Sequence, residues 1–216
     1  MRFELNLWHH VCMTTVPLFP LSRALFPGGV LHLRIFEVRY LDMIQQCLDN
    51  NIEFGVVALT SGSEVRLPMT QETFIETGTL ARINEAQTIM PGLMQIQCSG
   101  THRFQLEKST QKSNGLWEAE ISLLPTEQSI TITEDLQACA DALGKVIADL
   151  QRDGVPPEAM PISPPFMLSD TAWVANRWAE LLPLPPTQKA LLLRENDPVQ
   201  RLDLLREVLL VKGLIK

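Results

Sequence analysis

The chain has 216 residues, of which 45% are hydrophobic and 20% are charged, and its formal net charge is −7. This composition excludes a chain that is disordered throughout, because such chains carry fewer apolar residues. Acidic side chains outnumber basic ones both before and after residue 125. Neither half offers the basic surface that unspecific binding to a nucleic-acid backbone requires, so we expect no nucleic-acid partner.

The cysteines are scattered, and no pair has the spacing of a zinc site or a disulfide framework. They are Cys12, Cys47, Cys98 and Cys139. This pattern predicts buried thiols in a reducing compartment. No apolar run approaches the length of about 18 residues that a membrane helix needs. The first residues also lack the apolar core of a signal peptide, and a cytoplasmic location without a membrane partner is expected.

Residues 1–13 fit poorly with the sequence that follows and have two interpretations. Met13 stands directly before a strong pattern, so residues 1–13 are interpreted as an extension upstream of the natural start. The alternative is an N-terminal strand, because Phe3, Leu5 and Leu7 alternate with polar residues.

Residues 14–125 are predicted to form a β-rich unit of about six strands and one helix. Its prolines at 17, 20 and 27 exclude a regular helix near the start. Residues 30–36 alternate, with Leu31, Leu33 and Ile35 on one strongly apolar face. Short strands separated by turns are typical of a barrel or a sandwich. Further strands are predicted over 53–59, 79–85, 93–98, 102–107 and 116–124, and a helix within 37–51 with the apolar stripe Tyr40, Leu41, Ile44, Cys47 and Leu48.

Residues 126–216 are predicted to form an α-helical bundle, because the hydrophobic period changes to 3.6 after Pro125. The five prolines within residues 155–168 exclude a helix there and predict a long connection. Trp173 and Trp178 are interpreted as anchors between helices. Four helices are predicted, with Thr133, Ser169, Thr187 and Asp197 as their N-caps.

Motifs that mark catalysis are missing from the sequence. Residues 139–146 lack the glycine and the hydroxyl residue of a phosphate loop, and no G-x-G-x-x-G, H-E-x-x-H or G-x-S-x-G occurs. Ser109 and Ser113 lie near lysines in a segment interpreted as a polar hairpin loop, whereas a catalytic Ser–Lys pair needs a desolvated site. His32 is a lone histidine in a strand. We therefore expect no enzyme, no cofactor and no metal site.

A series of ordered motifs resembles the Lon substrate-binding (N-terminal) domain family. The likeness spans about residues 14–210, and Val38 stands where that family usually has proline. The matching segments are 18–21 (LFPL), 25–28 (LFPG), 33–40 (LRIFEVRY), 54–57 (FGVV), 78–83 (GTLARI), 100–104 (GTHRF), 181–184 (LLPL), 189–192 (KALL) and 201–205 (RLDLL).

The resemblance implies an α+β fold in which a PUA-like β-barrel, residues 14–125, precedes the helical bundle, residues 126–216. It implies a stand-alone, non-catalytic recognition module for unfolded or apolar polypeptide segments, without the ATPase and protease domains of full Lon proteases. A cleft between barrel and bundle is the expected binding place. The alternative is a PUA-like module that binds a small molecule or RNA.

The motif residues themselves are interpreted as structural. Gly28, Gly78 and Gly100 are predicted to occupy turns that need a positive φ. Arg34, Glu37 and Arg39 lie where a strand becomes a helix, and ion pairs or bonds to the main chain are expected there. No substrate-binding residue is therefore assigned from the sequence.

Overall fold

The computed structural model describes residues 14–65, 72–156 and 159–216, so the interpretation of residues 1–13 lies outside the described residues. The described part contains six strands and five helices, and the predicted mixture of helix and sheet is confirmed. The strands are β1 (Thr14–Leu21), β2 (Val30–Ile35), β3 (Phe54–Ser61), β4 (Thr73–Met90), β5 (Leu93–Gln111) and β6 (Trp117–Leu123). The helices are α1 (Val38–Asn50), α2 (Gln137–Arg152), α3 (Thr171–Leu181), α4 (Pro186–Arg194) and α5 (Pro198–Val211).

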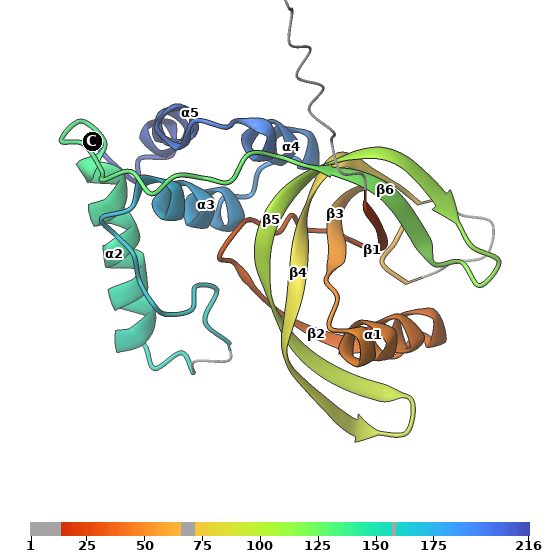
Figure 1. Cartoon of the computed structure of the whole chain (residues 1–216). Coiled ribbons are helices and arrows are strands. Elements are labelled where there is room, and N and C mark those ends of the chain that lie inside the picture. Colours follow the sequence, from red (N-terminus) through yellow and green to blue (C-terminus); the bar gives the residue numbers. More distant parts are fainter. Residues whose placement is uncertain (1–13, 66–71, 157–158) are drawn as a thin grey trace, which may run out of the picture.

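The sheet runs in the order β2-β5-β4-β3-β1-β6, and β6 also pairs with β5. The pairings among β5, β4, β3, β1 and β6 therefore return to their starting strand, and β2 lies outside this ring on β5 (Figure 1). The β1–β3 pair is parallel and the other pairs are antiparallel. Among the described strands, β2 pairs only with β5, and none of them lies beside its other edge.

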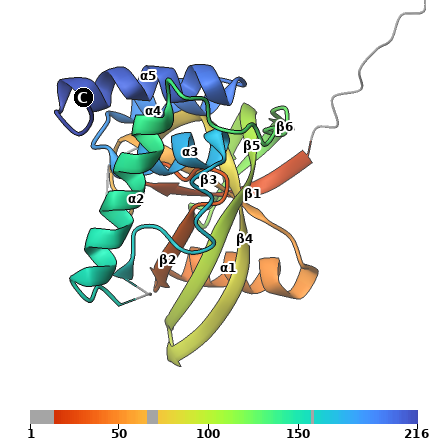
Figure 2. The same cartoon turned by 90° about the vertical axis from the view of Figure 1, so that its left-hand side faces the viewer.

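The two longest strands differ from the sequence prediction. The predicted strands 93–98 and 102–107 are parts of the single strand β5, and the predicted strand 79–85 is the middle of β4. Gly100 does not break β5, because its backbone continues the pairing with β4 opposite Ala81. The far ends of both strands form a hairpin arm that projects beyond the sheet (Figures 1 and 2).

Helix α1 covers one side of the sheet, and its buried face contains Met43 in place of the predicted Leu48. Tyr40, Met43, Ile44 and Cys47 are buried, whereas Leu48 is 40% exposed. Met43 lies three residues after Tyr40 and four before Cys47, so it belongs to the buried stripe, and Leu48 lies one step of rotation outside it. Asn51 ends the helix as predicted, in the left-handed conformation with φ 51°.

The helical part is arranged around α3, whose residues 171–179 are all buried. Helices α2, α3 and α5 pack on one another, whereas α4 lies against β3 and β4. The prediction of one bundle of four helices therefore describes three of them. In Figure 1, α3 lies between α2 and the sheet. A helix that is covered on all sides is typical of the centre of a domain.

The helix starts were predicted with mixed success. Asp197 caps α5 through Val199 N, and Pro198 takes the first helical position, as predicted. The other three N-caps are displaced to Leu136, Asp170 and Pro185. At α3 the N-cap is Asp170 and not Ser169, because the Asp170 carboxylate accepts the capping hydrogen bond from Trp173 N at 2.8 Å.

The sheet and the helices share a hydrophobic core. The largest buried cluster joins sheet-part residues with residues of α2, α3, α4 and α5. The glycine-rich turn between β1 and β2 therefore packs directly on the helices, and this contact positions the site described next. The sheet-part members are Ala24, Phe26, Ala58 and Ile75.

Candidate functional site

A cavity of about 240 Å³ lies where the sheet meets α3, and we call it the joint cleft. It is formed by the turn before β2, by β5, by the extended segment that follows β6, and by α3 with the residues before it. The lining residues are Pro27, Thr101, His102, Arg103, Leu124, Pro125, Thr126, Glu127, Gln128, Ser129, Met167, Asp170, Ala172, Trp173 and Asn176.

The joint cleft opens because β5 changes partners along one edge. Its residues 94–99 pair with β2, and its residues 104–111 pair with β6. At the first end of the gap, Gly28 N donates to Gly100 O at 2.9 Å. At the second end, Leu124 N donates to Arg103 O at 2.9 Å. The two partner strands diverge between these bonds, and the cleft occupies the space between them.

Arg103 forms the floor of the joint cleft and is 2% exposed. Its Nη1 donates to Leu193 O at 2.6 Å and to Glu195 O at 2.8 Å, and its Nη2 donates to Pro125 O at 3.0 Å. Its Nε lies 3.2 Å from Glu127 Oε1. Arg103, which lies on β5, thereby holds both the loop before α5 and the segment after β6.

Arg201 of α5 reaches the same carboxylate from the helical side and is fully buried. Its Nη1 bonds Glu127 Oε1 and lies 2.6 Å from Asn176 Oδ1. Asn176 Nδ2 in turn donates to Glu127 Oε2 at 2.8 Å. Burial and the positive charge of Arg201 lower the pKa of Arg103. We call Arg103, Glu127, Asn176 and Arg201 the joint cluster.

The solvent side of the joint cleft combines apolar and polar groups. Met167 is 45% exposed, Leu124 is half-buried, and Trp173 contributes its ring from the first turn of α3. Asp170 is occupied by Trp173 N and by the Ser129 hydroxyl, which both donate to its carboxylate. Both carboxylates of the cleft are thus committed to structural bonds, and the arrangement favours binding over acid–base chemistry.

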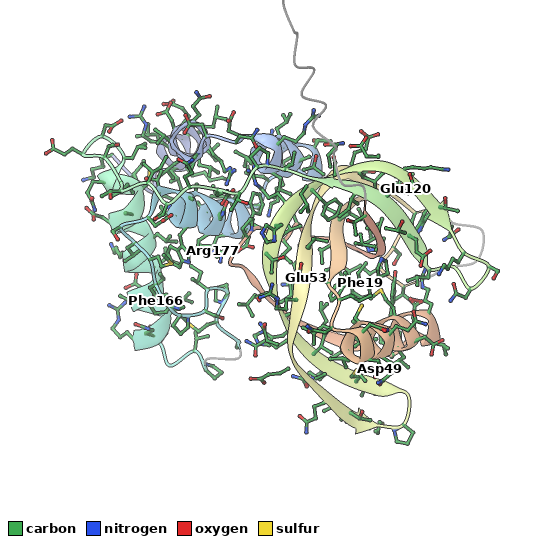
Figure 3. All side chains as sticks on the ribbon, in the orientation of Figure 1. Phe19, Asp49, Glu53, Glu120, Phe166 and Arg177 are labelled. Atoms are coloured by element: carbon green, nitrogen blue, oxygen red, sulfur yellow. The ribbon has the colours of Figure 1, made fainter. Side chains whose placement is uncertain are left out.

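The C-terminal half of α3 holds the glycine-rich turn in place. Arg177 Nη2 donates to Pro27 O at 2.9 Å, and Phe26 N donates to Glu180 Oε1 at 2.9 Å. Figure 3 places Arg177 between α3 and the sheet. A methyl group on Gly29 would lie 2.0 Å from Glu180 Oε1, so it would displace the carboxylate that accepts the hydrogen bond from Phe26 N.

The predicted glycine roles are confirmed at one position and wrong at two. Gly28 has φ +73°, whereas Gly78 and Gly100 do not have a positive φ. They are required for close approach instead: a Cβ on Gly100 would lie 2.3 Å from Phe26 O, and one on Gly78 would lie 2.5 Å from Val56 O. The motif glycine of β5 therefore brings the turn against the strand.

The predicted corner role of Arg39 is confirmed. Its Nη1 donates to Gly115 O at 2.7 Å, and its Nη2 lies 3.0 Å from Glu37 and 3.2 Å from Glu72. Arg34, from the same motif, is exposed. We call Glu37, Arg39 and Glu72 the corner cluster.

The remaining predicted residues have structural positions. Trp178 Nε1 donates to Cys139 O at 2.9 Å, so this tryptophan joins α3 to α2 as expected. Ser109 lies in β5 and not in a loop, because the strand continues to Gln111. Glu127 and Asn176 lie outside the motifs quoted from the sequence, and Arg201 was quoted only as the start of the 201–205 motif, without a role. No motif connects residues so far apart.

The three cysteines within the described ranges are free and buried, as predicted. Burial raises the pKa of Cys47 and Cys139 to about 11 and that of Cys98 to about 12. Among residues 14–65, 72–156 and 159–216, no group of three or more His, Cys, Asp or Glu side chains could hold a metal ion. No helix in this part of the chain is long and apolar enough to cross a membrane.

Comparison with known proteins adds to this geometry. The chain matches the family described as the ATP-dependent protease La (LON) substrate-binding domain over residues 15–211. A crystal structure of a Lon N-terminal domain protein from Xanthomonas campestris is similar with 30% sequence identity and a TM-score of 0.71, over 90% of this chain and 98% of that one. No curated protein matches the chain.

A second solved structure has the same fold at lower identity. It is the N-terminal domain of a Lon protease from the Mycobacterium avium complex, with 18% identity and a TM-score of 0.57, over 90% of this chain and 97% of that one. The family match covers both the sheet and the helices that enclose the joint cleft. The chain therefore belongs to the Lon substrate-binding domain family, whose domain is the non-catalytic, substrate-binding part of the protease.

Proposed function

We propose that this protein binds unfolded or apolar polypeptide segments and that the joint cleft receives part of the bound segment. The observation that carries the proposal is the exposed Met167 beside Leu124 and Trp173, at the opening of a cleft in a substrate-binding family. A methionine side chain adapts to apolar groups of different shape, which suits a site with many substrates. Folded proteins bury their apolar side chains, so we expect them to bind poorly to the joint cleft.

The size of the joint cleft sets the affinity that we expect. A volume of about 240 Å³ has room for one or two side chains. Burial of each contributes about 1.5–3 kcal/mol. The loss of translational freedom and the ordering of the peptide offset much of this. The cleft alone therefore falls short of the roughly 8 kcal/mol of a micromolar complex, and the micromolar affinity that we expect requires further contacts along the bound segment.

The proposal also includes the division of the chain into two subdomains and its location in the cell. We regard residues 14–125 as a PUA-like barrel and residues 126–216 as the helical subdomain, supported by the closed ring of strand pairings. A cytoplasmic location is supported by the free, buried thiols of Cys47, Cys98 and Cys139.

The test is a titration of fluorescein-labelled, denatured model proteins followed by anisotropy. Met167→Asp places a charge at the opening of the cleft and is expected to weaken binding by about fivefold or more. The matched control is Leu204→Asp on α5, since Leu204 is also exposed but does not line the cleft. The control is expected to bind as the wild type does.

Two outcomes contradict the proposal. Equal binding by the wild type and Met167→Asp would remove the joint cleft from the binding surface. Absence of binding at about 100 μM, together with capture of RNA or a small metabolite, would favour the alternative function.

A further inference from the structure

We propose that the free edge of β2 accepts an extended segment of the substrate as an added strand. The inference rests on the proposed polypeptide binding and adds the conformation in which the substrate is held. Strand addition provides affinity through main-chain hydrogen bonds, whose geometry does not depend on the substrate's sequence.

The pairing of β2 with β5 determines which main-chain N–H and C=O groups of β2 are free to bond another strand. Gly100 N donates to Gly29 O at 2.8 Å, and pairing continues from Val30 opposite Ser99 to Ile35 opposite Met94. Since main-chain groups alternate in direction, Val30, His32 and Arg34 direct theirs away from β5. Within the described part of the chain, no hydrogen bond is made to these outward groups. They form a row of unpaired donors and acceptors of the kind that pairs with another strand.

Two hollows lie end to end along this edge, and we call them together the β2 groove. One, of about 380 Å³, is lined by Val30–His32, and the other, of about 240 Å³, by His32–Ile35. Both also contain Arg23, which makes them neighbours. Successive side chains of a strand point to opposite faces, so a hollow lined by successive residues runs along the strand's edge.

The groove ends in apolar side chains. Phe36 and Val65 are 55% and 43% exposed at the end near α1. Met160 and Leu181 are half-buried at the end near α3. An extended segment along β2 would place alternate side chains toward these apolar groups, as in other strand-addition sites.

The charges along the groove favour an acidic segment. Arg23 and Arg34 are exposed, and within the described ranges neither forms an ion pair with a carboxylate. Three carboxylates also line the groove: Glu37 and Glu180 are engaged by Arg39 and Arg177, and Glu64 accepts a hydrogen bond from Ser22 N. The two arginines therefore outnumber the one carboxylate that has no arginine partner among the described residues. The occupant is therefore an extended polypeptide segment with alternating apolar residues and acidic residues beside them.

The hairpin arm of β4 and β5 also has an unpaired edge, but it lacks this lining. The hollow beside it is lined mainly by polar residues, and residues 84–92 are exposed. The edge of β2 instead combines outward main-chain groups with two hollows that contain the apolar side chains of Phe36, Val65, Met160 and Leu181.

The test uses two labelled peptides, about eight residues long, with alternating valine and threonine and an aspartate near each end. One carries N-methyl groups on the odd residues and the other on the even residues. A strand bound to β2 uses alternate N–H groups, so one isomer is expected to lose binding by about tenfold or more while the other changes little. The unmethylated peptide is the reference.

A reversal of charge at Arg34 tests whether the peptide binds along β2. Arg34→Glu is expected to weaken binding of the aspartate peptide by about fivefold and to improve binding of a lysine version. Arg194→Glu, an exposed control that does not line the groove, is expected to change neither.

The outcomes separate this inference from the proposed function. Equal binding of both methylated isomers, or no effect of Arg34→Glu, would overturn strand addition while denatured proteins still bind. Failure of every peptide and every denatured protein would overturn the proposed function itself. A dimer in sedimentation experiments that the peptide does not dissociate would assign the edge to a second copy of the chain and overturn the proposed occupant.

Discussion

Arg39 and Arg103 are both buried and both donate to main-chain carbonyls, yet the clusters around them are balanced differently. In the corner cluster, one guanidinium faces the two carboxylates of Glu37 and Glu72. In the joint cluster, Arg103 and Arg201 share the single carboxylate of Glu127. The other bonded donors of these two arginines reach main-chain carbonyls, Asn176 and Asn196, whereas Arg201 Nε is buried and has no hydrogen-bond partner among the described residues.

The difference reflects what each cluster connects. The corner cluster lies within the sheet part and attaches α1 to Gly115. Burial alone would lower the pKa of Arg39, but Tyr40, Glu37 and Glu72 outweigh it and raise that pKa. The joint cluster attaches β5 to α5 and to the segment after β6, and burial lowers the pKa of Arg103. The walls of the joint cleft therefore depend on one carboxylate.

The largest effect is expected for Glu127→Gln. This change removes the carboxylate that both buried guanidinium groups contact and leaves Arg103 only the more distant charge of Glu195. Loss of one partner from a buried ion pair typically costs about 3–5 kcal/mol. We expect a loss of that size in the free energy of unfolding, measured in urea. A loss below about 1 kcal/mol would show that the carbonyls alone balance both arginines and would break the comparison.

Gly100→Ala is expected to cost about 1–3 kcal/mol, because the added methyl group meets the Phe26 carbonyl, which cannot move away easily. The measurement is again urea unfolding. Gly144→Ala is the control, since its Cβ would meet only the end of the Leu168 side chain at 3.1 Å. An equal loss in both variants would contradict the close approach of turn and strand.

Glu37→Gln is expected to cost about 1 kcal/mol, because Glu72 remains beside Arg39 and Glu37 is partly exposed. The ratio of this loss to that of Glu127→Gln measures the difference between the clusters. Similar losses at both sites would mean that the number of carboxylates does not matter.

The smallest effect is a pH dependence at Glu180. Burial raises the pKa of Glu180 in the folded chain. Between the ordinary glutamate pKa and this higher value, the folded chain binds the proton that the unfolded chain has released. The free energy of unfolding therefore falls as the pH rises through this window. Glu180→Gln is expected to remove that fall, whereas Glu207→Gln, on the exposed side of α5, should retain it.

Much of the fold could be predicted from local patterns. The alternation over residues 30–36, the helical stripe of α1 and the Asp197 cap are all found in the structure. Errors occurred where a local pattern had two explanations. Glycine at position 100 is compatible with a turn or with close approach of two backbones, and only the position of Phe26 distinguishes them.

The candidate site was predictable in place but not in composition. The family resemblance pointed to the junction of the sheet and the helices, and a cavity lies there. Its residues could not be assigned, because Arg103 bonds carbonyls of residues 125, 193 and 195. Every residue has such a carbonyl, so these contacts leave no signal in the sequence.

The sequence by itself determined the family and the type of most elements, because hydrophobic period, proline positions and ordered motifs are local properties. It did not predict β1, and it divided β5 into two strands. The tertiary structure decided which edge remained open and which charges met. Because β6 closes the ring on β5 and not on β2, one edge of β2 stays unpaired among the described strands. Likewise, Glu127 meets Arg103 and Arg201 only after the helices pack on the sheet, since the contacts that join them depend on the path of the whole chain.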